Sequence, residues 1–150
     1  MRTPFQVLVI LYRKINEEIE YALFFRKKLN ICQFVSGGWE DEKKPIETVV
    51  RELREETQIK ITKEDVVELA SKSTIPVLNI TGEFTWGKDV YVVYEHTFAV
   101  NVQYSEIVIS DEHKGFNWLK YEEAMEKLRF DSNKNALWEL NEKLKNGEIK

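Results

Sequence analysis

Three glutamates in one short segment, Glu52, Glu55 and Glu56, have the spacing of side chains that share one face of a helix. At about 100° per residue they fall within roughly a third of the helix circumference. Like charges placed in this way repel one another unless a cation lies among them. Mg²⁺ binds a few carboxylates and keeps water and phosphate oxygens as its other ligands. The spacing therefore indicates a divalent metal site. The competing interpretation is a solvated acidic face neutralised by Arg51 and Arg54.

The segment that carries these glutamates has the signals of a helix that begins at Pro45 and ends near Gln58. Proline suits the first helical position because its missing N–H has no partner there in any case. The apolar residues of the segment share the side opposite to the glutamates: Ile46, Val50 and Leu53. A turn at Gly37 and Gly38 precedes the helix, and its backbone amides could face a chain of phosphates.

The rest of the chain alternates between strand-like and helix-like segments. Strands are predicted over residues 5–12, 21–25, 33–35, 66–73, 77–80, 91–102, 106–109 and 116–119. Residues 13–20 are predicted to form a turn between the first two strands. Helices are predicted over 121–128 and 133–144, with Ser132 as the N-cap of the second. The sum is a mixed α+β fold in one domain over residues 1–150.

Composition excludes several classes of protein. A net charge of −4 argues against binding to a nucleic-acid polymer, which needs clustered basic residues. No apolar run has the roughly 18 residues that a membrane span needs. The single cysteine, Cys32, excludes intrachain disulfides and thiolate metal clusters. These features predict a soluble, cytoplasmic protein of a single domain.

Residues 37–59 resemble the Nudix box, which reads Gly, five residues, Glu, seven residues, then Arg-Glu-aliphatic-x-Glu-Glu-x-Gly-aliphatic. Gly37 matches the first glycine, and residues 51–56 (RELREE) match the core. The resemblance implies an α/β/α sandwich around a mixed sheet. It also implies that the core glutamates bind Mg²⁺ or Mn²⁺ and that Arg51 holds them in orientation.

Two positions depart from the box. Lys43 stands where the first Glu belongs, and Gln58 stands where the last Gly belongs. In the family that Glu lies close to the box arginine, so Arg51 needs another acidic partner. The sequence offers three candidates for this partner: Glu40, Glu42 and Glu47.

Segments outside the box resemble the bacterial dATP pyrophosphohydrolase branch of the family, also described as dihydroneopterin triphosphate pyrophosphatases. These segments begin near Gln33, at Glu112-His113 and at Ser132. The resemblance favours Glu112 as a fourth carboxylate, acting as metal ligand or as base for the attacking water. His113 is expected to orient its loop or to contact substrate.

The resulting prediction is metal-dependent hydrolysis of a nucleoside or pterin triphosphate to a monophosphate and pyrophosphate. The predicted catalytic residues are Arg51, Glu55, Glu56 and Glu112, and the predicted metal ligands are Glu52, Glu55, Glu56 and Glu112. The predicted substrate contacts are Arg26, Gln33, Gly37, Gly38 and Trp86, with Trp86 stacking on the ring. The alternatives are a Nudix hydrolase of an ADP-sugar or dinucleotide, and a nucleotide-binding domain without turnover. The oligomeric state is left open between monomer and homodimer.

Overall fold

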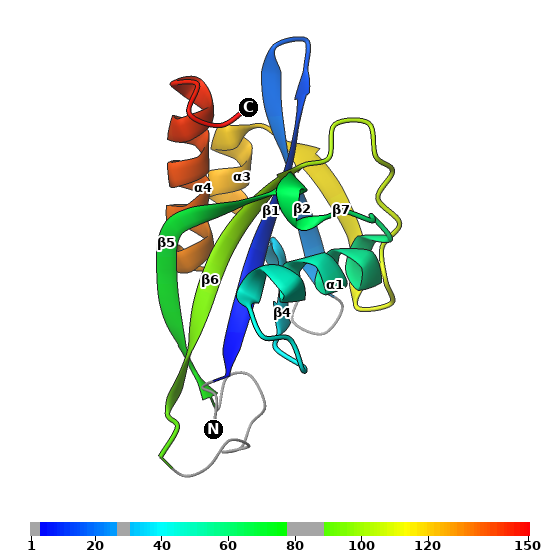
Figure 1. Ribbon diagram of the computed structural model, residues 1–150. Helices are drawn as coiled ribbons and strands as arrows, with labels where there is room; N and C mark the ends of the chain where they lie inside the picture. Colours follow the sequence, from blue (N-terminus) through cyan, green and yellow to red (C-terminus); the bar gives the residue numbers. More distant parts are fainter. Residues whose placement is uncertain (1–3, 27–30, 78–88) are drawn as a thin grey trace.

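A mixed β-sheet forms the centre of the computed structural model, which describes residues 4–26, 31–77 and 89–150 (Figure 1). The strands are β1 (Phe5–Ile15), β2 (Glu18–Arg26), β3 (Cys32–Gln33), β4 (Val35–Gly38), β5 (Val66–Pro76), β6 (Val92–Asn101) and β7 (His113–Leu119). The helices are α1 (Pro45–Thr57), the short 3-10 helix η1 (Lys63–Asp65), α3 (Tyr121–Lys127) and α4 (Asp131–Lys145). The main sheet order is β3-β2-β1-β6-β5, while β4 also pairs with β1 and β7 with β2.

Strand β1 is the centre of the sheet. It runs parallel to β6 from the Phe5–Tyr94 pair to the Tyr12–Asn101 pair. On its other side it runs antiparallel to β2 and β4. Its apolar run is buried on both faces, because one set of alternating side chains points to each layer.

Helices cover both faces of the sheet, as Figure 1 shows. On one face, Val49 and Leu53 of α1 pack in a cluster with Val7 and Val9 of β1. On the other face, α3 and α4 pack in a cluster with Leu8 and its neighbours on β1. The predicted α/β/α sandwich is therefore confirmed.

The hairpin between β1 and β2 is longer than predicted. Ile15 pairs with Glu18, so the turn consists of only Asn16 and Glu17, both with positive φ. Two left-handed residues are what a two-residue hairpin turn requires. Residues 13–20 are polar because most of them extend beyond the core, and this polarity caused the wrong prediction of a turn over the whole segment.

Residues 106–109, predicted as a strand, are irregular. The backbone N–H of Val108 donates to the carbonyl of Thr57, and that of Ser110 donates to the carbonyl of Glu56. The segment therefore occupies the C-terminal carbonyls of α1 instead of joining the sheet. This attachment holds the following loop, which carries Glu112, against α1.

Helix α4 anchors an irregularity in β5. The pairing of β5 with β6 shifts between Glu68 and Lys72, and the backbone N–H groups of Ala70 and Ser71 donate to the Glu139 carboxylate at 2.6 and 2.7 Å.

Helix α4 begins at Asp131, so Ser132 lies in its first turn and is not the N-cap, contrary to the prediction. Within the described ranges, no helix is long and apolar enough to cross a membrane.

Candidate active site

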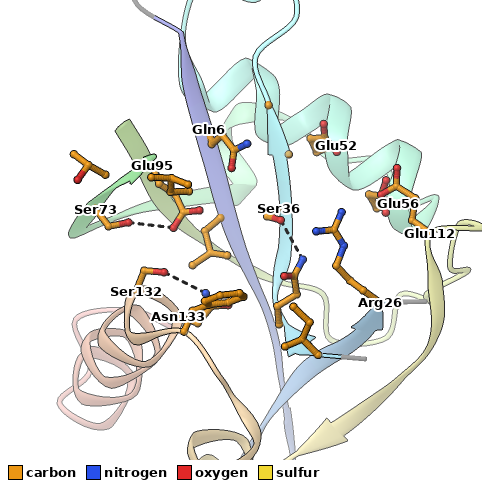
Figure 2. A pocket seen from close by; sticks show the side chains of 18 of the residues that line it. Gln6, Arg26, Ser36, Glu52, Glu56, Ser73, Glu95, Glu112, Ser132 and Asn133 are labelled. Atoms are coloured by element: carbon orange, nitrogen blue, oxygen red, sulfur yellow. Dashed lines mark hydrogen bonds between the residues drawn. The ribbon is translucent and has the colours of Figure 1, made fainter. Parts of the chain in front are cut away.

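The four predicted metal ligands line one cavity of ≈ 690 Å³. Glu52 and Glu56 are buried on α1, while the side chain of Glu55 is 49 % exposed. Figure 2 shows Glu112 beside Glu56, where the loop before β7 approaches α1. The structure thus brings together carboxylates that are nearly 60 residues apart in the sequence.

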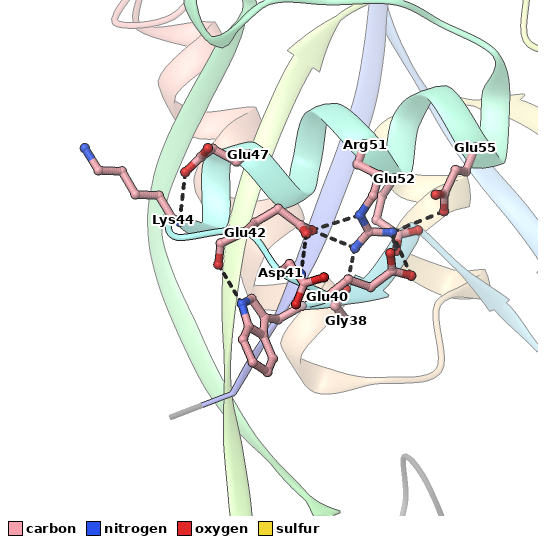
Figure 3. Close-up of polar contacts among 10 residues, drawn as sticks. Gly38, Glu40, Asp41, Glu42, Lys44, Glu47, Arg51, Glu52 and Glu55 are labelled. Atoms are coloured by element: carbon pink, nitrogen blue, oxygen red, sulfur yellow. Dashed lines mark hydrogen bonds and ion pairs between the residues drawn. The ribbon is translucent and has the colours of Figure 1, made fainter. Parts of the chain in front are cut away.

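Arg51 connects this helix to Gly38 at the end of β4 (Figure 3). The turn predicted at Gly37 and Gly38 is wrong, because both residues pair with β1 as part of that strand. Its Nη2 donates to the Gly38 carbonyl at 2.6 Å, and its Nε donates to Glu42 Oε1 at 2.8 Å. Its Nη1 donates to Glu52 at 3.0 Å and to Glu55 at 3.2 Å. A guanidinium with its donors in a fixed plane can hold several acceptors at once, so Arg51 fixes the orientation of the carboxylates.

Glu42 is the acidic partner of Arg51. It replaces the glutamate that the box pattern places at position 43, where this chain has lysine. Its side chain is nearly buried against Arg51, whereas Glu40 is exposed and lies 3.5 Å from the guanidinium. Glu47 has a different task, because its carboxylate accepts the backbone N–H of Lys44 at the start of α1. The chain therefore supplies this carboxylate one residue earlier than the box pattern does.

Glycine is required at position 37 by the close approach of Glu52. A Cβ atom built on Gly37 would overlap the Glu52 carboxyl group. Gly37 pairs with Val7, so its missing side chain faces the α1 layer. Gly38 has open space around it and contributes its carbonyl to Arg51.

Glu56 is held by residues that follow the irregular segment. Its Oε2 accepts hydrogen bonds from Ser110 Oγ at 2.9 Å and pairs with His113 Nε2 at 2.8 Å. Burial raises the pKa of Glu56, but the hydrogen bonds from His113 and Ser110 outweigh burial and lower it below its usual value. Of the two roles expected for His113, the geometry favours orientation: the buried imidazole holds Glu56.

The pKa of Glu52 shifts in the opposite direction from that of Glu56. Burial, together with the neighbouring charges of Glu55 and Glu56, raises the pKa of Glu52 to about 7 despite its contact with Arg51. As they stand, no three His, Cys, Asp or Glu side chains of the described ranges converge closely enough to enclose a metal ion. The donor set nevertheless fits one, because the four predicted carboxylates share a cavity whose described lining contains no thiolate, and Glu52 among them is buried and under-compensated. A hard divalent cation matches both properties.

The predicted substrate contacts that the structure describes lie in the same cavity: Arg26, Gln33, Gly37 and Gly38. Gln33 Nε2 donates to Ser36 Oγ at 3.2 Å, and both residues line the cavity. Trp86 lies outside the described residues.

Sequence analysis missed the end of the cavity away from α1. Its polar lining comes from several elements: Gln6, Ser73, Glu95, Ser132 and Asn133. Glu95 could have been found, because it is a charged residue inside the apolar strand segment 91–102. Strand alternation places it on the face of Thr97 and Ala99, where a carboxyl group is out of place in a core.

The model of the NUDIX domain family matches residues 4–139 of this chain. The crystal structure of a Listeria monocytogenes protein assigned to the NUDIX hydrolases is 38 % identical, with a TM-score of 0.84 and 97 % of each chain covered.

Two more distant structures share the fold. The E. coli dihydroneopterin triphosphate pyrophosphohydrolase is 20 % identical, with a TM-score of 0.72, over 91 % of this chain and 95 % of that one. A C. elegans Ap4A hydrolase is 19 % identical, with a TM-score of 0.67, over 94 % of this chain and 97 % of that one. No curated protein sequence matches the chain.

Proposed function

Because the chain belongs to the NUDIX family of hydrolases, we propose that it cleaves a pyrophosphate bond in a small triphosphate. The proposed substrates are a dATP-like nucleoside triphosphate and dihydroneopterin triphosphate, and the products are a monophosphate and pyrophosphate. The observation that carries the proposal is the cavity that Glu52, Glu55, Glu56 and Glu112 line together, next to the Arg51 clamp. We also propose that residues 1–150 act as a single domain.

The carboxylates of Glu52, Glu55, Glu56 and Glu112 would hold Mg²⁺ or Mn²⁺. When bound, the cation neutralises phosphate oxygens and lowers the pKa of a water molecule. The protein's own part is to hold the orientation of these carboxylates in the cavity. Arg51 does this for Glu52 and Glu55, and His113 does it for Glu56.

Glu112 is the proposed base for the attacking water, because it lies beside Glu56 on a loop at the rim of α1 (Figure 2). Arg26 and Gln33 line the same cavity and are proposed to bind the phosphate chain. Arg26 supplies fixed positive charge, and the Gln33 amide supplies a donor. Attack of water on phosphorus then needs no covalent intermediate with the protein.

Two alternative functions can be distinguished from this proposal by experiment. One is hydrolysis of an ADP-sugar or a dinucleotide; the fold likeness to the C. elegans Ap4A hydrolase keeps the latter in the panel. The other is a nucleotide-binding domain without turnover, motivated by Lys43. Glu42 weakens this second alternative, since it restores the acidic partner of Arg51.

The test is a panel of nucleoside triphosphates, dihydroneopterin triphosphate, ADP-ribose and Ap4A, assayed for pyrophosphate and monophosphate with Mg²⁺, Mn²⁺ or a chelator. We expect metal-dependent pyrophosphate release from at least one triphosphate. Glu126→Gln, on the exposed face of α3, is the matched control and should retain the wild-type rate. Turnover of ADP-ribose or Ap4A alone, or of nothing in the panel, would contradict the proposal.

A further inference from the structure

We infer that Glu95, at the end of the cavity away from α1, recognises the ring of the substrate. Its carboxylate would accept hydrogen bonds from two adjacent N–H groups, the 2-amino-lactam edge that guanine and pterin rings share. The inference rests on the proposed function, because it assumes a ring attached to the phosphates that reach Glu52 and Glu56. Of the proposed substrates, it favours dihydroneopterin triphosphate over a dATP-like nucleotide.

The sheet itself sets the distance between the two ends. Ser73 pairs with Glu95, Glu95 with Gln6, and Gln6 with Gly38, so one row crosses four strands from β5 to β4. Neighbouring strands lie about 4.8 Å apart, which puts the backbone of Glu95 about 10 Å from that of Gly38. Gly38 in turn holds Arg51, the residue that orients Glu52. The span suits a nucleoside whose ring lies at Glu95 and whose phosphates lie at α1.

Glu95 is buried, and its known contacts leave much of its hydrogen-bonding capacity unused. It is 4 % exposed, and Ser73 Oγ donates to its Oε1 at 3.3 Å (Figure 2). Burial raises the pKa of Glu95, while the hydroxyls of Ser73 and Ser132 lower it. None of the ion pairs among the described residues includes Glu95.

A carboxylate offers about four acceptor sites. Two hydroxyl donors therefore leave room for a ligand that also donates. A core carboxyl of this kind is costly unless something pairs with it, and Glu95 lines a cavity that a ligand can enter. The missing donors are therefore expected from the bound molecule.

The chemistry of a carboxylate selects among rings. Guanine and pterin present a ring N–H and an exocyclic amino group side by side, and both donate. Adenine presents an amino donor beside a ring nitrogen that only accepts, so its lone pair would face a carboxylate oxygen. Phe130, at the same end of the cavity and partly exposed, offers an aromatic face against which a flat ring can pack.

Calorimetric titration of the intact protein with dGMP, dIMP, dAMP and neopterin tests the inference without requiring turnover. dIMP differs from dGMP only by the missing 2-amino group. We expect dGMP to bind roughly 10- to 100-fold more tightly than dIMP, the range for one hydrogen bond lost from a buried charged partner. Glu95→Gln should remove this difference, while Glu126→Gln should keep it.

The ring source follows from the neopterin titration. Loss of neopterin binding in Glu95→Gln, with dGMP weak in both proteins, supports a pterin substrate; the reverse pattern supports a guanine nucleotide. Equal affinity of the wild type for dGMP and dIMP, or no binding of dGMP and neopterin at millimolar concentration, overturns the inference. It is also overturned if Glu95→Gln lowers the melting temperature and keeps the dGMP preference, because Glu95 would then be structural. Failure of the proposed function is a separate result: no triphosphate would be hydrolysed, whatever the ring preference in binding.

Discussion

Glu52 and Glu139 are both largely buried glutamates with basic neighbours, yet their pKa values move in opposite directions. Hydrogen bonds to Glu139 from Lys143, Ser71 and the backbone N–H of Ala70 outweigh the effect of burial and lower its pKa to about 2. Burial and two further carboxylates raise the pKa of Glu52 to about 7. One carboxylate has as many donors as it can use, and the other is crowded by charges of its own sign.

The difference is the one expected between a carboxylate that supports the fold and one that is available to a ligand. Glu139 joins α4 to the irregular part of β5, and its four donors all lie between 2.6 and 2.7 Å. Glu52 faces the cavity with Arg51 as its cation and leaves acceptor capacity for a ligand. Perturbed acids in a cavity are candidates for function because the fold tolerates their cost there.

The largest expected effect is on turnover. Glu52→Gln and Glu56→Gln should each lower kcat about 10²- to 10³-fold, the range for removing one group that stabilises transition-state charge. Glu139→Gln should leave kcat unchanged, because it lies outside the cavity. Steady-state rates at saturating Mg²⁺ measure this, and a wild-type rate in Glu56→Gln would remove the metal-site assignment.

The same Glu52 variant has an expected effect on stability. The folded-state pKa is raised, so the charged carboxyl costs stability as pH rises above about 4.5, with the full cost above about 7. Glu52→Gln should therefore raise the melting temperature at pH 8 in a chelator and have less effect at pH 5. A decrease at pH 8 would mean that Arg51 already compensates Glu52.

Next in size is the support for Arg51. Glu42→Gln should reduce metal affinity or activity about 10- to 100-fold, as loss of a residue that orients metal ligands commonly does. Glu40→Gln is the matched control, because its carboxylate is exposed and more distant from Arg51. Lys43→Glu should be nearly neutral. A large gain from Lys43→Glu would show that Glu42 does not replace the missing carboxylate.

Glu139→Gln should lower the free energy of unfolding at pH 7 by about 2 kcal/mol, within the range for charge-assisted hydrogen bonds. The folded-state pKa is lowered, so this stabilisation is present above pH 4.5 and is lost as pH falls towards 2. Urea unfolding at several pH values measures the effect, with Glu142→Gln on the exposed side of α4 as control. If the difference in free energy of unfolding between the wild type and Glu139→Gln persists at pH 2, the packing of the Glu139 side chain and not its charge holds the β5 irregularity.

The smallest expected effect concerns the end of α1. Gln58 has φ 60°, the left-handed conformation that favours glycine. Gln58→Gly should stabilise the fold by about 0.5–1 kcal/mol, since it removes the strain of a side chain in that region. Thermal unfolding measures this, and kcat should not change.

Residue spacing predicted the part of the site on α1 together with Gly37 of β4, and the family resemblance added Glu112 from the loop before β7. The glutamates of α1 share a helical period, and Gly37 lies at a fixed distance before them, so local spacing was enough. The sequence offered three candidates for the acidic partner of Arg51. Only the side-chain contacts in the structure identify Glu42 as this partner and exclude Glu40 and Glu47.

Glu95 stands out in the sequence as a charged residue within an apolar strand, but its place at the opposite end of the cavity could not be predicted because it depends on strand pairing. Glu95 and Gln6 are about 90 residues apart, and they become neighbours only through the parallel register of β1 and β6. Residues 106–109 have strand-like composition, but the N–H groups of Val108 and the following Ser110 donate to carbonyls at the end of α1. Local propensity says nothing about such competition between distant partners.

The parallel pairing of β1 with β6 also has a consequence for how the chain folds. Parallel strands far apart in sequence require a long loop to close before any contact stabilises it, which slows folding. During synthesis, β1, β4 and α1 leave the ribosome well before β6. One edge of β1 is therefore unpaired until β6 has been synthesised. We therefore expect a nascent chain ending before residue 92 to be prone to aggregation and to lack the end of the cavity that Glu95 lines. Pairing of β6 with β1 should cover the exposed strand edge and complete the cavity.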